Sequence, residues 1–441
     1  MNLYEWQKPH AQKVLDRLKE SGIVCDNSDT GTGKSYIALW VAKEYGHPVF
    51  IVAPKAILPK WRELCVDIGI TPLGIMNVER LKRSKFIAKV SNSYVWTLPP
   101  GTLVIVDEIH GFGGVKTANA MILYATRAAK LPVIGLSATV ANSPLRLRAL
   151  GYLLGLFPDW YKFYPWALQH GAEEITMRIW RGGQPQFIKT IQFVPEHKVA
   201  QEGVQKIHED IFTMGKGFRL RSGESPGFPE NHIIVDRVSF DKTSDIRRAY
   251  DEIQKKVSES GKLVVSQIIT LRQQIELLRV PDLSEMVRDL SEEHSVVVFL
   301  NFRESVRQLE SAIHEKTDHN FRVSVIVGDQ KEEVREIERL FFQRNESRIC
   351  LCTFGAGGLG LDLHDLNGRP RISILNPTWS AVQMVQALGR IHRAGSLSPA
   401  VQKLIYAAGT VEEDVAKRVE ASLNNLSLLQ DGDISPLKGL V

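Results

Sequence analysis

The stretch "DTGTGKS", Asp29 to Ser35, decides how the first part of this 441-residue chain is interpreted. It follows a short apolar run, Ile23 to Cys25, that predicts a strand. It leads into Lys34 to Tyr45, where apolar residues recur at helical spacing. Glycines let backbone N–H groups approach oxygen atoms closely, and a helix start adds its dipole and free N–H groups. The order strand, glycine-rich turn, helix therefore predicts a loop that holds phosphate.

Individual residues of this loop have predicted roles. Lys34 would reach the β- and γ-phosphates of ATP, and the Ser35 hydroxyl would ligate Mg²⁺. The general pattern of phosphate loops has glycine where Ser28 stands, so an ordinary strand, turn and helix is the alternative for this stretch alone. The rest of the predicted nucleotide-binding loop consists of Thr30, Gly31, Thr32 and Gly33.

Three further apolar strands run into polar residues. "GTLVIVDEIHGF" leads to Asp107, placed to hold Mg²⁺ directly or through water, and to Glu108, placed to deprotonate the attacking water. "LPVIGLSATV" runs into Ser137 and Thr139, and "PVFIVAPK" runs into Lys55. Acids also end strands in solvated loops, which is the alternative for the acidic pair. A parallel sheet wound with helices binds its ligands where the strands end, so the four signals together predict an ATP site.

The second half of the chain again alternates strand and helix signals but has no phosphate loop of its own. "RICLCTFGAGGLGLDLHDLN" predicts a strand that runs into a glycine-dense loop. "RISILNPTWSAVQMVQALGRIHRAG" predicts a strand, a turn and a helix that ends in Arg390 and Arg393. Arginines from a facing domain stabilise charge on a transferring phosphoryl group, which is the predicted role of both. The alternative is a solvated helix end, where cations also favour the helix dipole.

Composition limits the class of protein only loosely. The net charge of +5 and the pI near 8.8 permit a polyanionic partner without demanding one. The four cysteines lack paired CxxC spacing, which argues against a zinc site and favours a reduced, cytoplasmic chain. The sequence has no run of about 18 apolar residues, so no membrane partner is expected. A monomer is the expected state.

The order of these signals resembles that of the superfamily-two helicases and translocases, most closely their Swi/Snf-type branch. The resemblance covers about Leu3 to Glu413 and includes the glycine-rich segment "FGAGGLGLDL" and the segment "QALGRIHRAGSLSPAVQKLIYAAGTVEE". The other matching segments are "LYEWQKPHA", "DTGTGKS", "IVAPKAILPKW", "DEIH" and "GLSATV". A compact chain of this kind looks like a phage or bacterial enzyme that remodels DNA in repair, recombination or replication.

The resemblance implies an α/β fold with two RecA-like parallel-sheet lobes, an ATP cleft between them and an inserted or bridging segment. We expect the first lobe at residues 1–160, the bridging segment at 161–285 and the second lobe, with a C-terminal helix, at 286–441. The aromatic stretch "FPDWYKFYPWAL" is either the core of a small subdomain or a stacking wedge for bases.

The resemblance also implies roles for single residues. Gln7 would read adenine with Trp6 packed beside it, and Gly360 and Asp362 would lie at the nucleotide. Three residues would couple the nucleotide state to the grip on nucleic acid: Ser137, Thr139 and Gln386. Backbone phosphates would be met by Lys55, Lys60 and Arg62. The basic cluster in "ERLKRSKFIAK" is a further phosphate contact or, equally well for any single lysine, a solvated helix face.

The predicted function is an ATP-driven motor on duplex, forked or branched DNA that uses ATP and Mg²⁺. Duplex translocation, fork or branch remodelling and strand separation are all possible outputs, and no dedicated strand-separating pin is indicated. Two alternatives stay open: an ATP-switched clamp on DNA or on a protein partner that moves little, and an RNA helicase.

Overall fold

The computed structural model describes residues 3–91, 93–112, 117–138, 144–181, 184–194, 197–260, 265–315, 322–357, 361–378, 380–410, 412–413 and 416–417. The chain divides into two compact units. We call Met1–Glu224 the first unit and Ser225–Glu420 the second unit. The segment predicted as a bridge, residues 161–285, is therefore shared between them.

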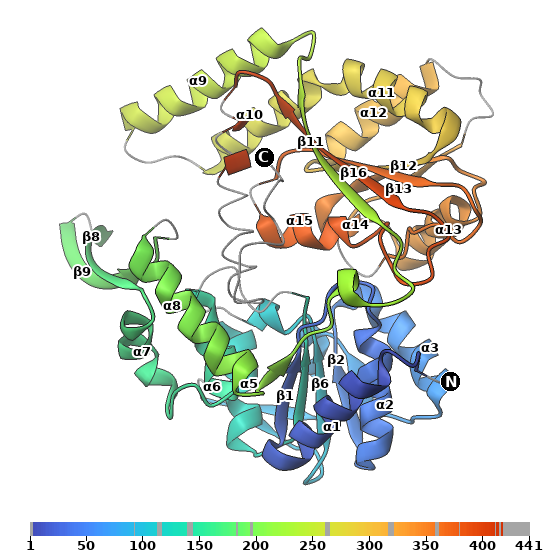
Figure 1. Ribbon diagram of the computed structural model, residues 1–441. Coiled ribbons are helices and arrows are strands. Elements are labelled where there is room, and N and C mark those ends of the chain that lie inside the picture. Colours follow the sequence, from blue (N-terminus) through green and yellow to red (C-terminus); the bar gives the residue numbers. More distant parts are fainter. Residues whose placement is uncertain are drawn as a thin grey trace. The chain divides into compact units, whose positions relative to one another are not determined.

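The first unit is built on a six-stranded sheet in the order β10-β1-β7-β6-β2-β3. All of its neighbouring strands are parallel. Short apolar runs such as "LVIVD" form buried strands because helices cover both faces of the sheet (Figure 1). The strands are β1 (Ile23–Asp26), β2 (Val49–Val52), β3 (Gly74–Met76), β6 (Leu103–Asp107), β7 (Val133–Leu136) and β10 (Gly217–Phe218).

Alternation along these strands divides the core of the first unit into two layers. Val24, Ile51 and Ile105 lie in one layer with apolar residues of three helices: α1 (Lys8–Ser21), α2 (Lys34–Tyr45) and α3 (Leu58–Ile68). Cys25 and Phe50 point the other way, into a layer with four more helices: α5 (Ala118–Ala128), α6 (Arg148–Leu153), α7 (Phe163–Gln169) and α8 (Lys198–His208). The short helix α4 (Val78–Leu81) precedes an antiparallel pair, β4 (Ile87–Val90) and β5 (Ser93–Trp96).

The second unit has its own six-stranded parallel sheet in the order β11-β16-β15-β12-β14-β13. The strands are β11 (Asn231–Val238), β12 (Ser295–Leu300), β13 (Val323–Ile326), β14 (Ile349–Thr353), β15 (Arg371–Leu375) and β16 (Ala400–Ala407). The helices are α9 (Thr243–Ser260), α10 (Val265–Leu278), α11 (Val280–Glu293), α12 (Arg303–Glu315), α13 (Glu332–Gln343), α14 (Phe354–Gly357) and α15 (Ala381–Leu388). Val296 and Val298 of the central strand lie in one core with Leu309 of α12.

The predicted fold class is confirmed, because both halves are parallel sheets wound with helices, as RecA-like lobes are. No helix in the described part of the chain is long and apolar enough to cross a membrane. In the aromatic stretch, Phe163 and Trp166 are buried in the core of the first unit, as the subdomain-core alternative predicts. Trp160 and Tyr161 are exposed, and Trp160 stacks on Tyr124 with the ring centroids 6.0 Å apart.

One element of the first unit was missed in the sequence. Strands β8 (Glu173–Arg181) and β9 (Gln184–Gln192) form an antiparallel hairpin that extends away from the sheet beside α7 and α8 (Figure 1). Apolar residues alternate along the first of these strands, and the sequence Gly182-Gly183 separates the two. A Gly-Gly pair between alternating runs is a hairpin signal, so the pattern could have predicted the element.

Candidate nucleotide site

The four polar signals of the first unit meet at one edge of its sheet. Strands β1, β7, β6 and β2 are consecutive neighbours, and the carboxyl ends of parallel strands lie at the same edge. The phosphate loop follows β1, Ser137 follows β7, Asp107 ends β6, and Lys55 lies just beyond β2. The coupling residue Thr139 lies outside the described residues. The structure therefore brings the four strand-end signals of the first unit together at one sheet edge.

The phosphate loop turns on two glycines in the left-handed region. Gly31 has φ +85° and Gly33 has φ +88°. Residues other than glycine adopt this backbone conformation only at a cost in free energy. A Cβ atom at Gly33 would lie 2.4 Å from Nε2 of Gln7, so a larger residue there would displace the Gln7 side chain. Helix α2 begins at Lys34, directly after Gly33. The free N–H groups of its first turn therefore face the loop.

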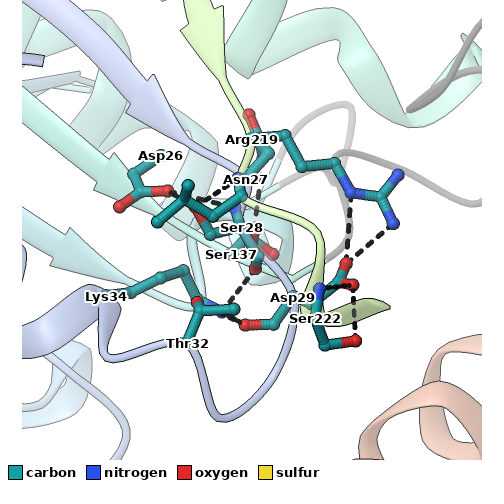
Figure 2. A network of polar contacts seen from close by, with 10 residues as sticks. Asp26, Asn27, Ser28, Asp29, Thr32, Lys34, Ser137, Arg219 and Ser222 are labelled. Atoms are coloured by element: carbon teal, nitrogen blue, oxygen red, sulfur yellow. Dashed lines mark hydrogen bonds and ion pairs between the residues drawn. The ribbon is translucent and has the colours of Figure 1, made fainter. Parts of the chain in front are cut away.

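Lys34 is held inside the loop by backbone carbonyl groups (Figure 2). Its Nζ donates to the carbonyl oxygen of Ser28 at 2.6 Å and to that of Asp29 at 2.9 Å. Burial lowers the pKa of Lys34, while the nearby carboxylates, Asp26 first among them, oppose this shift. Phosphate oxygens would offer the ammonium group stronger, charged acceptors than these carbonyls.

Ser28, the departure from the general loop pattern, has a structural role. Its hydroxyl donates to the Asp26 carboxylate, accepts from Leu220 N at 2.9 Å and lies 3.3 Å from Nε2 of His10. His10 is also 3.2 Å from Asp26, and the side chains of Ser28, Asp26 and His10 are buried. Burial raises the pKa of Asp26, but the contacts with His10 and Ser28 outweigh it, so the pKa is lowered overall. A glycine at residue 28 would take a hydrogen-bond partner away from each of these polar groups.

Asp29 ties the loop to a segment almost two hundred residues away. Nε and Nη2 of Arg219 donate to its Oδ1 at 3.1 and 2.7 Å, and Ser222 donates to its Oδ2 from the backbone at 2.9 Å and from the hydroxyl at 3.1 Å (Figure 2). Burial opposes ionisation, yet Arg219 and Ser222 lower the pKa of Asp29. The carboxylate therefore stays charged, and it fixes the start of the loop against the chain that follows β10.

Gln7 is bonded to the phosphate loop through its side chain. Its Nε2 donates to the carbonyl oxygen of Thr32 at 2.7 Å, and its Oε1 accepts from Tyr4 N at 3.0 Å. Trp6 stacks on Tyr4 with the ring centroids 5.9 Å apart. The N-terminal segment therefore reaches the loop directly, and the adenine contact of Gln7 and Trp6 remains a prediction.

Asp107 has the surroundings of a metal ligand. Its Oδ2 accepts from Nε1 of Trp61 at 2.9 Å, and its Oδ1 accepts from the backbone N of Glu108 at 2.9 Å. Burial and the charge of Glu108 raise the pKa of Asp107 to about 6, against the opposing effects of Trp61 and Lys34. A bound cation would offset this cost. The carboxylate and the Ser35 hydroxyl are hard oxygen donors of the kind that Mg²⁺ prefers, so the donor set fits the ion.

Glu108 is linked to Ser137 through a histidine that the sequence analysis left without a role. Nδ1 of His110 lies 3.2 Å from Oε2 of Glu108 and 2.8 Å from Oγ of Ser137. Glu108 itself has φ +52°, a strained conformation for a residue other than glycine. The position of His110 two residues after Glu108 was the available signal. The structure thus joins the predicted base to the predicted coupling residue on the neighbouring strand.

In the second unit, Arg390 and Arg393 both point to the segment that follows the glycine-dense loop. Arg390 donates to the carbonyl oxygens of Gln386 at 2.8 Å and Leu361 at 3.3 Å. Arg393 donates to Leu361 O at 3.0 Å and pairs with Asp362 at 2.6 Å. Arg390 is only 3% exposed, so the alternative of a solvated helix end is wrong for this residue. Gly360 lies outside the described residues.

The predicted phosphate-backbone cations lie beyond the carboxyl end of β2. Lys55 begins a short 3₁₀ turn, and Lys60 and Arg62 lie on α3. Lys55 and Arg62 are exposed and Lys60 is half-buried. Their contact with nucleic acid remains a prediction.

Fold and site together define a protein with two RecA-like units, the first of which carries a phosphate loop and an Asp–Glu pair at the carboxyl edge of its sheet. Residues 279–395 match the helicase conserved C-terminal domain family. A protein of Acanthamoeba polyphaga mimivirus, named as a "putative ATP-dependent RNA helicase", is 29% identical over 467 residues, which cover 98% of this chain and 84% of that protein.

Two CHD3-type chromatin-remodeling factors of Arabidopsis thaliana are 28% and 29% identical, over 33% and 30% of this chain but only 12% and 9% of their own lengths. Among solved structures, a Sulfolobus solfataricus SWI2/SNF2 ATPase core in complex with dsDNA is similar, with 16% identity, a TM-score of 0.39 and coverage of 100% of this chain and 95% of that one. The sequence matches thus support the resemblance of this chain to superfamily-two helicases of the Swi/Snf type.

Glu108→Gln is expected to lower ATP hydrolysis by about 10²-fold or more, because the amide keeps the size and hydrogen bonding of the side chain but cannot accept the proton of the attacking water. ATP should still bind. Single-turnover hydrolysis and nucleotide titration of the same protein separate the two effects. Glu79→Gln, on an exposed residue of the same unit, is the matched control. Turnover at the wild-type rate would remove Glu108 from the role of base.

Proposed function

We propose that this protein is an ATP-driven motor that moves on duplex or branched DNA. The observation that carries the proposal is the shared sheet edge of the first unit. There the phosphate loop, Asp107 with Glu108, and Ser137 follow three neighbouring strands. A second RecA-like sheet with arginines beside a glycine-dense segment supports a motor rather than a simple nucleotide-binding domain.

Different residues of the first unit would have different roles in ATP hydrolysis. Lys34 and the loop N–H groups would bind the β- and γ-phosphates, and Ser35 and Asp107 would hold Mg²⁺, which neutralises charge on the same phosphates. Glu108 would accept a proton from the attacking water. His110 would pass the state of Glu108 to Ser137, since it contacts both side chains.

The output that we propose is branch migration or fork regression. A translocase that pulls one arm of a junction exchanges base pairs for base pairs, and this exchange is nearly balanced in free energy. Opening a plain duplex costs about 1.4 kcal/mol per base-pair step in stacking. ATP should therefore drive remodelling of junctions more readily than release of a free strand.

RNA is the second candidate substrate, and one observation favours it. The mimivirus protein that is similar over almost the whole chain is named as an RNA helicase. The chromatin-remodeling relatives and the resemblance of the glycine-rich segment to the Swi/Snf branch favour DNA. An ATP-switched clamp is a third possibility, and it predicts slow hydrolysis that nucleic acid hardly changes.

The deciding experiment measures the ATPase rate with linear duplex, forked DNA, a four-way junction, single strands and RNA, at one stated salt concentration. We expect forks and junctions to stimulate hydrolysis more than linear duplex, and RNA to stimulate it least. Strand displacement and branch migration are followed on labelled substrates, with Glu108→Gln as the control that binds but does not turn over. Stimulation by RNA alone would assign the motor to RNA. Efficient unwinding of partial duplexes without junction activity would leave a conventional helicase.

A further inference from the structure

The hairpin of β8 and β9 is an exposed arm with a fixed base. Each strand has nine residues, so the arm is about 30 Å long. At the base, Ile191 packs against the core, Lys189 pairs with Glu174 at 2.8 Å, and the Tyr164 hydroxyl donates to Glu174 at 3.1 Å. Among the described residues, neither strand packs extensively on another helix or strand. The arm is therefore anchored to the first unit at one end only.

Apolar side chains are exposed along this arm. Phe187 is 71% exposed, Met177 46% and Ile188 39%. The register places Met177 opposite Ile188 on one face and Phe187 opposite Arg178 on the other. A lone two-stranded hairpin is marginally stable in water, and exposed apolar residues that gather on one element mark an interaction surface. These residues point to a partner for the arm.

Charge identifies the chemistry of that partner. The hairpin holds three cations, Arg178, Arg181 and Lys189, and its two carboxylates, Glu173 and Glu174, both lie at the base, where Glu174 pairs with Lys189. Arg178 is the cross-strand neighbour of Phe187 and lies toward the tip of the arm from the Lys189–Glu174 pair. Cations beside an exposed aromatic ring are the combination that binds single-stranded nucleic acid, through phosphates and base stacking.

We propose that this hairpin binds nucleic acid at unpaired bases, with Phe187 stacked on a base and Arg178 at a neighbouring phosphate. A base inside an intact duplex has both faces covered by its neighbours. The arm would therefore recognise single-stranded arms of forks and junctions rather than linear duplex. The inference rests on the proposed function, and it names the element that would give the motor its preference for branched substrates.

Phe187→Ala is the direct test, in the full-length chain, because an exposed side chain contributes little to stability. We expect affinity for a fork with single-stranded arms to fall roughly 10-fold, while affinity for blunt duplex changes less than about 2-fold. Phe187→Trp should restore binding. Arg178→Ala should weaken binding to the fork and reduce the slope of log K against log[salt] by about 1. The matched control is Val199→Ala, a 63% exposed apolar residue on α8 of the same unit.

The outcomes separate this inference from the proposed function. If nucleic acid stimulates the wild-type ATPase and Phe187→Ala binds forks normally, the hairpin proposal is overturned and the motor stands. If no nucleic acid stimulates the wild type but Phe187→Ala still weakens fork binding, the motor fails and the hairpin contact stands. A change of sedimentation in Phe187→Ala with normal fork affinity would assign the arm to contacts between copies of the chain, against the proposal.

Discussion

Lys34→Ala is expected to abolish ATP hydrolysis and to weaken ATP binding, while the chain stays folded. Lys34 supplies the only cation in the predicted phosphate loop, Asp29 to Ser35. It lies among four carboxylates, Asp26, Glu108, Asp107 and Asp29, that oppose its loss of charge. Without it, negative phosphates would approach this acidic site with no cation from the loop to offset the repulsion. Phosphoryl transfer depends mainly on positioning and on charge stabilisation of this kind.

The test compares turnover, nucleotide affinity and melting temperature of Lys34→Ala with those of Lys43→Ala. Lys43 lies on the same helix, is exposed, and donates to the carbonyl oxygen of Ile68 at 3.1 Å. The two variants lose the same charge from the same element, so only the position differs. Near-normal hydrolysis by Lys34→Ala would refute the assignment of the phosphate loop.

Arg390→Ala is expected to lower turnover by about 10³-fold while ATP affinity barely changes. The reason is that a contact formed with transition-state charge alters the rate of the chemical step and leaves ground-state binding alone. In the structure the guanidinium group is bonded to two backbone carbonyls, so the role requires that it exchange at least one of them for phosphate oxygens. Arg390→Lys keeps the charge without the planar fork and should restore activity only in part.

Because Arg390 is buried, its removal also costs stability, and the control must be an arginine with a purely structural position. Arg369 is half-buried and donates to the carbonyl oxygens of Ser291, Glu292 and His294 in the same unit. Arg369→Ala should lower the melting temperature and leave turnover per folded molecule unchanged. If Arg390→Ala and Arg390→Lys behave like this control, Arg390 is structural. If they lose ATP affinity and keep turnover, it is a simple binding residue.

The parts of the fold that could be predicted are those in which local pattern and tertiary environment agree. Helix α2 begins and ends where its apolar spacing indicated, and β1 extends one residue beyond the predicted run. The buried strands that end at Asp107 and before Ser137 could be predicted equally well. A parallel sheet covered on both faces requires nearly continuous apolar runs, and these are visible in the sequence. The polar residues that follow these strands were expected at one edge of the sheet, because the carboxyl ends of parallel strands lie at the same edge.

The parts that escaped prediction depend on distant partners. Nothing near Asp29 indicates that Arg219 will bind it, since the two residues are brought together only by the pairing of β10 with β1. Ser28 was interpreted as a departure from a pattern because its partners, His10 and Leu220, belong to other elements. The hairpin is a different case: its alternating apolar residues and its Gly-Gly pair are a local signal, which was missed although it depends on no distant partner.

Strand β10 comes late in the chain, and this affects when the first unit can finish folding during synthesis. The amide groups of Cys25, Asn27 and Asp29 donate to the carbonyl oxygens of Lys216, Phe218 and Leu220. On a ribosome, this edge of the sheet and the start of the phosphate loop stay incomplete until that segment has emerged, because chains are built from the amino end. Contacts between residues so far apart also slow folding. A nascent or truncated chain that stops before residue 216 would expose those amides as an open strand edge, which is a template for aggregation.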